Sequence, residues 1–250
     1  MRLELQMELL KPEIDIDYRR IIISYLKFAL EHCEGGRFFE KFYKNRDNIV
    51  KDYCFSTVFS KPRFTKEKIY FDKNEMKIIF SCSDRNRTGL IFQTAFLSIQ
   101  HMEFPLANEN HMILRKIIQK KEVLITEPVV YFQTMLGNGL CVREHNRETN
   151  RDTFITCEDK EFSEKAELII KNQLQMAGFY KKQYEDIKVK PVDCEKNSGK
   201  TLWYFYRFDS RCFKNIRRYE CITIFISKRC WKSSCNGLWK SQCDKTGEDE

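Results

Sequence analysis

The first 120 residues alternate between strand-like and helix-like patterns in an order that few folds accommodate. Arg2–Leu10 is apolar at every second position, which predicts a half-buried strand. Residues 18–32 carry apolar side chains at helical spacing, with Asp17 as the expected N-cap and Gly35-Gly36 ending the helix. The pattern continues with a strand at Tyr53–Phe59, a hairpin of Lys68–Phe71 and Met76–Phe80 around Lys73-Asn74, a helix at Leu90–Gln100 and a strand at His111–Gln119.

This order, β-α-β-β-α-β, is that of the ferredoxin-like unit, which many RNA-binding (RRM-like) domains share. The first half of the pattern then recurs further along the chain, so we predict an α+β protein of two tandem ferredoxin-like domains, residues 1–120 and 121–250. The second copy is predicted from strands at Val129–Thr134, Gly139–Arg143, Thr153–Thr156 and Asp186–Val192 and from a helix at Glu161–Met176. Its closing elements are not evident, so this domain is expected to be incomplete.

Composition narrows the class of protein. A hydrophobic content of 42% and the lack of any apolar run near the roughly 18–20 residues of a membrane span indicate a globular, cytoplasmic chain with no membrane partner. The net charge of +8 suits a polyanionic partner. The eleven cysteines form no Cys-x-x-Cys pair, which argues against a zinc site. No glycine-rich phosphate loop or nucleophile elbow occurs either, so we expect no cofactor, no metal site and, in any nuclease, metal-free chemistry.

Two polar segments carry residues suited to nucleic acid. Residues 37–46 interleave basic and aromatic side chains, and Met135–Asp152 ends in a dense run of arginines, asparagines and acids around His145. The planar guanidinium group of arginine fits phosphate. The simpler interpretation of Met135–Asp152 is a solvated, salt-bridged hairpin loop. Of the four histidines, His145 and His32 are the candidates to carry a proton, although His32 at a helix C-terminus is equally well explained by the helix dipole. The predicted RNA-binding residues are Arg37, Lys44, Arg46, Arg143 and Arg147.

Residues 1–196 resemble the CRISPR-associated endoribonucleases that cut precursor CRISPR RNA within its repeats. The resemblance rests on the opening strand and helix, on Tyr53-Cys54-Phe55-Ser56, which is similar to the family's Phe-Thr-Phe-Ser strand, and on Val142–Asp152. It implies cleavage without metal, in which a ribose 2′-hydroxyl attacks the neighbouring phosphate and yields mature guide RNAs. The implied partners are CRISPR repeat RNA and other subunits of an interference complex. A non-catalytic subunit that only holds the repeat is the alternative.

The same resemblance implies where the catalytic residues lie. Many relatives carry a histidine between the first helix and the Phe-Thr-Phe-Ser strand, with a lysine shortly after it. Here Tyr43 falls near the position of that histidine and Lys51 near that of the lysine. We therefore predict Lys51 as electrostatic stabiliser, Tyr43 as orienting or acid group, and His32 or His145 as proton carrier. A packed aromatic and a solvated lysine are the simpler interpretations of Tyr43 and Lys51.

Residues 197–250 differ from the rest: they hold all three tryptophans and five of the eleven cysteines. The resemblance implies a glycine-rich tail with a Gly-aromatic-Gly signature, and this segment has none. Because tryptophan has the single codon TGG, reading from its second base always gives glycine. Trp203, Trp231 and Trp239 would all become glycines in that frame, which suggests a frameshift near Lys196-Asn197. A divergent but genuine tail is the alternative, since Ile222, Ile224 and Ile226 alternate like a strand.

Overall fold

The chain divides into two compact units, Met1–Glu122 and Val123–Glu250, which are described separately below. None of the described helices is both long and apolar enough to cross a membrane. The computed structural model describes residues 1–43, 51–82, 86–121, 129–134, 142–146, 148–156, 158–176, 178–194, 204–209 and 239–241.

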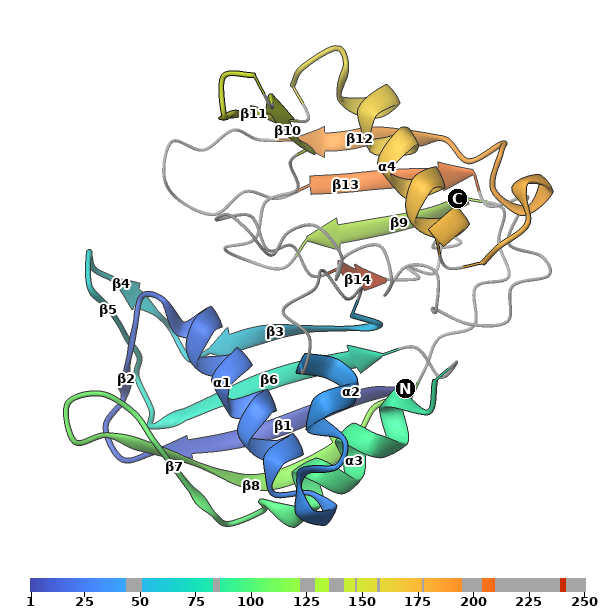
Figure 1. Cartoon of the computed structure of the whole chain (residues 1–250). Coiled ribbons are helices and arrows are strands. Elements are labelled where there is room, and N and C mark those ends of the chain that lie inside the picture. The colour runs from blue at the N-terminus through green and yellow to red at the C-terminus, as the bar shows by residue number, and fades with distance from the viewer. Residues whose placement is uncertain are drawn as a thin grey trace, which may run out of the picture. The chain divides into compact units, whose positions relative to one another are not determined.

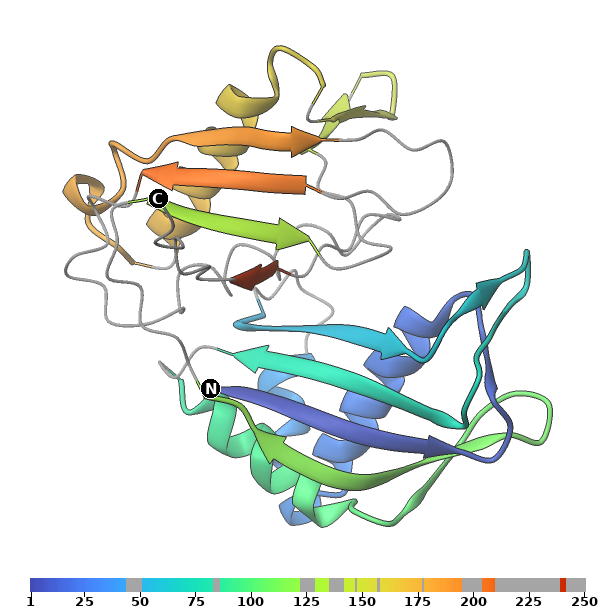
Figure 2. The same cartoon turned by 180° about the vertical axis from the view of Figure 1, so that it is seen from behind.

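The first unit is built on a five-stranded antiparallel sheet with the strand order β3-β6-β1-β8-β7. Helices α1 and α3 cover one face of this sheet, and Figure 2 presents the face turned away from them (Figures 1 and 2). The chain order β1-α1-β3-β6-α3-β8 together with this strand order is the ferredoxin-like topology, as predicted. The elements are β1 (Arg2–Leu9), α1 (Tyr18–Glu31), β3 (Tyr53–Phe59), β6 (Glu75–Cys82), α3 (Thr88–Ser98), β7 (Glu103–Pro105) and β8 (His111–Gln119).

The predicted alternation of β1 and the apolar stripe of α1 are both confirmed. The apolar residues of β1 point toward the helices, and its polar residues Glu4, Gln6 and Glu8 alternate with them. The buried stripe of α1 consists of the five predicted positions, Ile22, Tyr25, Leu26, Ala29 and Leu30. Aromatic rings from β3, β6 and α3 complete the core between the layers: Tyr53, Phe80, Phe92 and Phe96.

Two details at the ends of α1 follow from local chemistry. Asp17 occupies the N-cap position, but its carboxylate makes no capping hydrogen bond and instead pairs with Arg20 at 3.3 Å. The predicted side-chain cap is therefore wrong, because the carboxylate has a charged partner one turn into the helix. After the helix, Gly35 and Gly36 adopt positive φ angles of 68° and 80° in the short 3-10 turn Glu34–Gly36. A short helix, α2 (Phe39–Tyr43), follows.

The predicted hairpin of Lys68–Phe71 with Met76–Phe80 is wrong. The strand β5 (Lys68–Tyr70) pairs with β2 (Glu13–Asp15) and β4 (Arg63–Phe64) in a separate sheet, hereafter the small sheet. β6 pairs instead with β1 and β3. The ammonium of Lys68 bonds the carboxylate of Glu13 at 2.6 Å across the β2–β5 pair, a contact between residues far apart in sequence. The turn at Lys73-Asn74 therefore connects two sheets rather than two paired strands.

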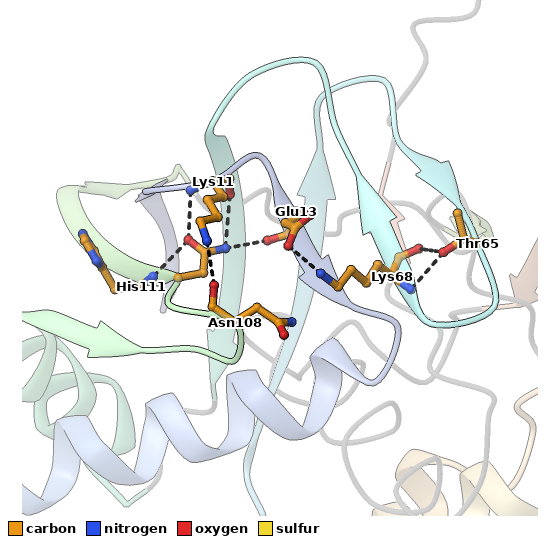
Figure 3. Close-up of polar contacts among 7 residues, drawn as sticks. Lys11, Glu13, Thr65, Lys68, Asn108 and His111 are labelled. Carbon is orange, nitrogen blue, oxygen red and sulfur yellow. Dashed lines mark hydrogen bonds and ion pairs between the residues drawn. The ribbon is translucent and has the colours of Figure 1, made fainter.

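A buried asparagine, Asn110, joins the start of the small sheet to the β7–β8 turn. Figure 3 shows its partners Lys11, Glu13 and His111. The side-chain oxygen of Asn110 accepts hydrogen bonds from the amides of Lys11 and His111, each at 2.9 Å. Its side-chain nitrogen donates to the carbonyl oxygens of Lys11 at 3.3 Å and Glu13 at 2.9 Å. The Lys11 ammonium adds a bond of 2.7 Å to the carbonyl oxygen of Asn108. One side chain thus satisfies four backbone groups of segments that are distant in sequence.

The second unit contains a four-stranded antiparallel sheet with the strand order β12-β13-β9-β14. Helix α4 lies against this sheet in both views (Figures 1 and 2). The strand order is that of a second ferredoxin-like unit, and the chain order β9-α4-β12-β13-β14 agrees with it, except that the place of the second helix, between β13 and β14, lies outside the described residues. This confirms the predicted fold class. The elements are β9 (Val129–Thr134), β10 (Val142–Asn146), β11 (Arg151–Ile155), α4 (Phe162–Met176), the 3-10 turn Lys181–Gln183, β12 (Val189–Cys194), β13 (Tyr204–Asp209) and β14 (Trp239–Ser241).

The strand boundaries in this unit correct three predictions. β10 and β11 form an antiparallel hairpin, so residues 144–146 and 151–152 of the predicted loop belong to paired strands. The strand predicted to begin at Asp186 begins at Val189 instead. Ile187, two residues before it, is fully buried but lies outside the strand. Residues 197–250, which under the frameshift hypothesis would lack the closing strands, contribute β13, at the centre of the sheet, and β14, at its edge.

Candidate functional site

Tyr43, the last residue of α2, lies beside the first residue of β3. The Tyr43 and Tyr53 hydroxyl groups are hydrogen-bonded to each other. The Tyr43 ring stacks on Phe39, with 5.5 Å between the ring centroids. Burial raises the pKa of Tyr43 to about 12, although the hydrogen bond with Tyr53 acts in the opposite direction. The phenol is therefore protonated at neutral pH, as a group that donates a proton must be.

Tyr53 is held in the aromatic core and is only 2% exposed. Its ring lies 4.9 Å from Phe92, 5.5 Å from Phe80 and 6.1 Å from Phe42, measured between centroids. Burial raises the pKa of the Tyr53 hydroxyl well above its usual range. Tyr53 is thus a fixed, neutral support for the Tyr43 hydroxyl.

Two lysines lie over the Tyr43 ring. The ammonium nitrogen of Lys51 is 4.4 Å from the ring centroid, and that of Lys27, from α1, is 5.1 Å from it. Partial burial lowers the pKa of Lys51, and repulsion from Lys27 lowers it further. Cations near an aromatic face are attracted to its π-electrons, and they would also stabilise a phenolate formed at Tyr43. The arrangement combines a proton donor with two positive charges.

The backbone after Lys51 is fixed to the start of α3. The hydroxyl of the fully buried Thr88 donates to the carboxylate of Asp52 at 2.7 Å, and the side-chain amide of Asn86 donates to the same oxygen at 3.2 Å. The ammonium of Lys41 in turn bonds the carbonyl oxygen of Asn86 at 2.8 Å. These contacts hold the entry into β3, and with it the position of Lys51.

Among the described residues, the contacts of the His32 side chain are with Phe28 and not with Tyr43 or Lys51. The His32 ring packs on Phe28 at 4.1 Å, and its Nδ1 lies 2.8 Å from the Phe28 carbonyl oxygen. Because a carbonyl only accepts, Nδ1 donates, and in the neutral ring Nε2 then carries the lone pair that a general base needs. Arg37 pairs with Glu34 at 2.8 Å and lies 4.5 Å from the centroid of Phe38.

His145 belongs to the second unit, on the β10–β11 hairpin. Its Nδ1 lies 2.9 Å from a carboxylate oxygen of Asp152, the residue directly opposite it in the register. The carboxylate of Glu144 pairs with Lys165 of α4, which ties the hairpin to the helix. The predicted RNA-binding residues Lys44, Arg46 and Arg147 lie outside the described residues, and only the backbone of Arg143 is described.

Sequence patterns did not single out two members of this site, Tyr53 and Lys27. The sequence pattern places Tyr53 only within a predicted strand. Its hydroxyl group was the feature that could have identified it as a site residue, because an apolar core position seldom needs a hydroxyl. Lys27 stands on the polar side of α1, where any lysine is expected. In the described ranges, no three His, Cys, Asp or Glu side chains gather as metal ligands would.

Comparison with known proteins identifies the fold. No protein-family model matches the sequence, and no curated protein matches it significantly. Solved structures with the same fold include a protein described as the product of a Cas6-related gene from Pyrococcus furiosus, with 13% identity, a TM-score of 0.66, and coverage of 98% of this chain and 99% of that one. A RAMP protein described as binding different RNA substrates has 16% identity and a TM-score of 0.66, covering 97% and 99% of the two chains.

A third structure, described as the CRISPR-associated protein Cas6, has 14% identity and a TM-score of 0.61, again over 97% and 99% of the two chains. The likeness thus extends through both units of the chain. At these identities it establishes a shared fold. The structural neighbours therefore include Cas6, a Cas6-related protein and a RAMP protein.

Proposed function

We propose that this chain is a metal-independent endoribonuclease that cleaves precursor CRISPR RNA within its repeats. The fold shared with Cas6 proteins supports the substrate class. The observation that carries the proposal is the environment of Tyr43: its hydroxyl is anchored to Tyr53, and the ammonium groups of Lys51 and Lys27 lie within 5.1 Å of its ring. Such a site can supply a proton and positive charge to a phosphodiester without another group.

The proposed reaction begins when the ribose 2′-oxygen attacks the neighbouring phosphorus and ends when the 5′-oxygen leaves. One proton must be removed from the 2′-hydroxyl and one given to the departing oxygen. Tyr43 gives that proton, and Lys51 stabilises the extra negative charge on the phosphorane. In this proposal His32 accepts the proton of the 2′-hydroxyl. The products are an RNA with a cyclic 2′,3′-phosphate and an RNA with a free 5′-hydroxyl.

RNA binding would use the basic residues around this site. Arg37 and Lys41 belong to the segment that leads to Tyr43, and the net charge of +8 favours a polyanion. Phosphate contacts of this kind make affinity fall steeply with salt. Other subunits of an interference complex are further partners in this proposal.

The second candidate is a non-catalytic subunit that holds repeat RNA. It is favoured by the likeness to a RAMP protein described as binding different RNA substrates. It also agrees with a tyrosine, rather than a histidine, at the position of Tyr43, because a phenol with a pKa of about 12 accepts protons only rarely at neutral pH.

Incubation of the full chain with CRISPR repeat RNA in EDTA separates the candidates. We expect cleavage that survives EDTA and disappears when the 2′-hydroxyl at the cut site is replaced by hydrogen. Salt-sensitive binding without cleavage would support the non-catalytic subunit. Absence of binding even at low salt would exclude both.

A further inference from the structure

A buried hydroxyl beside the proposed acid has a single described partner. We propose that Tyr53 is a positioning residue for Tyr43: it donates its hydroxyl proton to the Tyr43 oxygen, so that the Tyr43 proton faces the substrate. This inference rests on the proposed function for its catalytic meaning. Its structural part, the direction of one hydrogen bond, can be tested without RNA.

The direction follows from the number of donors and acceptors. Each tyrosine hydroxyl has one hydrogen to donate and can also accept. Among the described residues, Tyr43 is the only hydrogen-bond partner of the Tyr53 hydroxyl, and Tyr53 is 2% exposed, with its ring packed against Phe42, Phe80 and Phe92. If Tyr43 were the donor, the Tyr53 proton would remain in an apolar core without an acceptor, which is unfavourable. Donation from Tyr53 satisfies the buried group.

Donation from Tyr53 also sets the role of Tyr43. Tyr43 is half-buried, so its own hydrogen can turn toward the surface, where a phosphodiester would lie. When the Tyr43 O–H bond breaks and the proton joins the departing 5′-oxygen, the phenolate that remains keeps the hydrogen bond from Tyr53. The charges of Lys51 and Lys27 stabilise the same phenolate. The histidine that accepted the 2′-hydroxyl proton releases it to solvent, and the phenolate takes up a proton from solvent, so the cycle balances.

The kinetic test uses Tyr53→Phe in the full chain, a change that removes one oxygen and keeps the ring. We expect kcat for repeat-RNA cleavage to fall roughly ten- to a hundredfold, with RNA affinity unchanged, because the lost bond is one to a charged group in the transition state. In a Tyr43→Phe background, the same change should cause no further loss. The matched control is Tyr25→Phe, which also removes a buried tyrosine oxygen. The Tyr25 hydroxyl has no hydrogen-bond partner among the described residues, so this variant should cleave at the parental rate.

The second test measures the direction of the bond. The protein is labelled with 3-fluorotyrosine, the Tyr43 fluorine signal is assigned by its loss in Tyr43→Phe, and its ionisation is followed by NMR. Removing a donor from the Tyr43 oxygen destabilises the phenolate, so Tyr53→Phe should raise the pKa of Tyr43 by about one unit, a tenfold change in its acid constant. If Tyr43 were the donor, the same variant would lower that pKa.

The outcomes separate the two proposals. Parental cleavage by Tyr53→Phe, or a loss that adds to that of Tyr43→Phe, overturns the positioning role. A pKa of Tyr43 that falls or stays constant overturns the direction of the bond. If the parental chain cuts no repeat RNA, the proposed function fails, while the NMR result still decides the hydrogen bond.

Discussion

A lysine that is shielded from water and close to a second lysine holds its proton less firmly than a solvated one. Lys51 is in this position, with its pKa lowered by burial first and by Lys27 second. If its charge stabilises the phosphorane, cleavage should decline as the pH rises through that lowered pKa. We expect Lys51→Ala to reduce kcat by about tenfold or more at pH 7 with little change in RNA affinity. Lys51→Arg should move the alkaline decline to higher pH, since arginine stays charged.

Rates of single-turnover cleavage across pH provide the measurement for these two variants. Lys66→Ala, at an exposed position between β4 and β5, is the matched control and should behave as the parent does. An unchanged rate in Lys51→Ala would remove Lys51 from the site.

The contacts of Glu4 predict how the stability of the fold depends on pH. Its side chain is 8% exposed, and its carboxylate lies 2.6 Å from the ammonium of Lys120 and 3.3 Å from that of Lys77. The Lys120 bond is the main cause that lowers the pKa of Glu4 to about 2. A lowered carboxyl pKa stabilises the fold above the unfolded-state value of about 4.3, and this contribution is lost as the pH falls toward 2.

Glu4→Gln should therefore lower the free energy of unfolding at pH 7 by about 2 kcal/mol, after allowance for screening around the half-exposed lysines. Urea unfolding at several pH values checks this, and the difference from the parent should shrink below pH 4. Glu75→Gln, an exposed glutamate on the neighbouring strand β6, is the control and should change little. A difference that is constant with pH would contradict the assigned cause.

At the scale of elements, the connection between the small sheet and the β7–β8 turn depends on Asn110. Its side chain is buried and bonds four backbone groups, so Asn110→Ala leaves several buried donors and acceptors unpaired. We expect a loss of about 2–3 kcal/mol in the free energy of unfolding. Asn74→Ala, at an exposed turn, is the control for the same substitution. A loss in Asn110→Ala no larger than that in the control would mean that water replaces the side-chain bonds.

The elements also indicate what the sequence could predict. β1 and α1 were predictable because their patterns are local: apolar residues at every second position in one, and a stripe of five in the other. The pairing of β5 was not, because the turn at Lys73-Asn74 has the same local signature whether or not its flanking strands pair. The choice is made by pairing with Glu13 of β2, which is distant in sequence, in addition to the adjacent β4.

The candidate site, too, could be predicted from the sequence only in part. The resemblance to CRISPR-associated endoribonucleases directed attention to Tyr43 and Lys51, and the structure places them together. The resemblance gave no partner for the Tyr43 hydroxyl, because the hydrogen bond with Tyr53 depends on how α2 lies against β3. Tyr53 stands where the related motif has phenylalanine and Tyr43 near where it has histidine, so two departures from the pattern meet in one hydrogen bond.

For the molecule as a whole, the tail from residue 197 remains the main prediction to test. If a frameshift lies near Lys196-Asn197, the gene read one base later should encode glycines at positions 203, 231 and 239, within a continuous reading frame. The protein translated from the restored frame should bind repeat RNA more tightly than this chain, because glycine lets the backbone approach phosphate closely. Resequencing of the gene and filter binding provide the measurements. A shifted frame that soon meets stop codons would mean that the tail is genuine.

The position of β1 has a consequence for synthesis on the ribosome. This first strand to be made lies between β6 and β8, so its two edges stay unpaired until residues 75–82 and then 111–119 have emerged. From that moment every strand of the first sheet is available, before most of the second unit has been translated. Tyr43, Tyr53 and Lys51 are all encoded upstream of that point. A change of reading frame near codon 197 therefore reaches the ribosome only after the segment that carries the proposed acid has been released to fold.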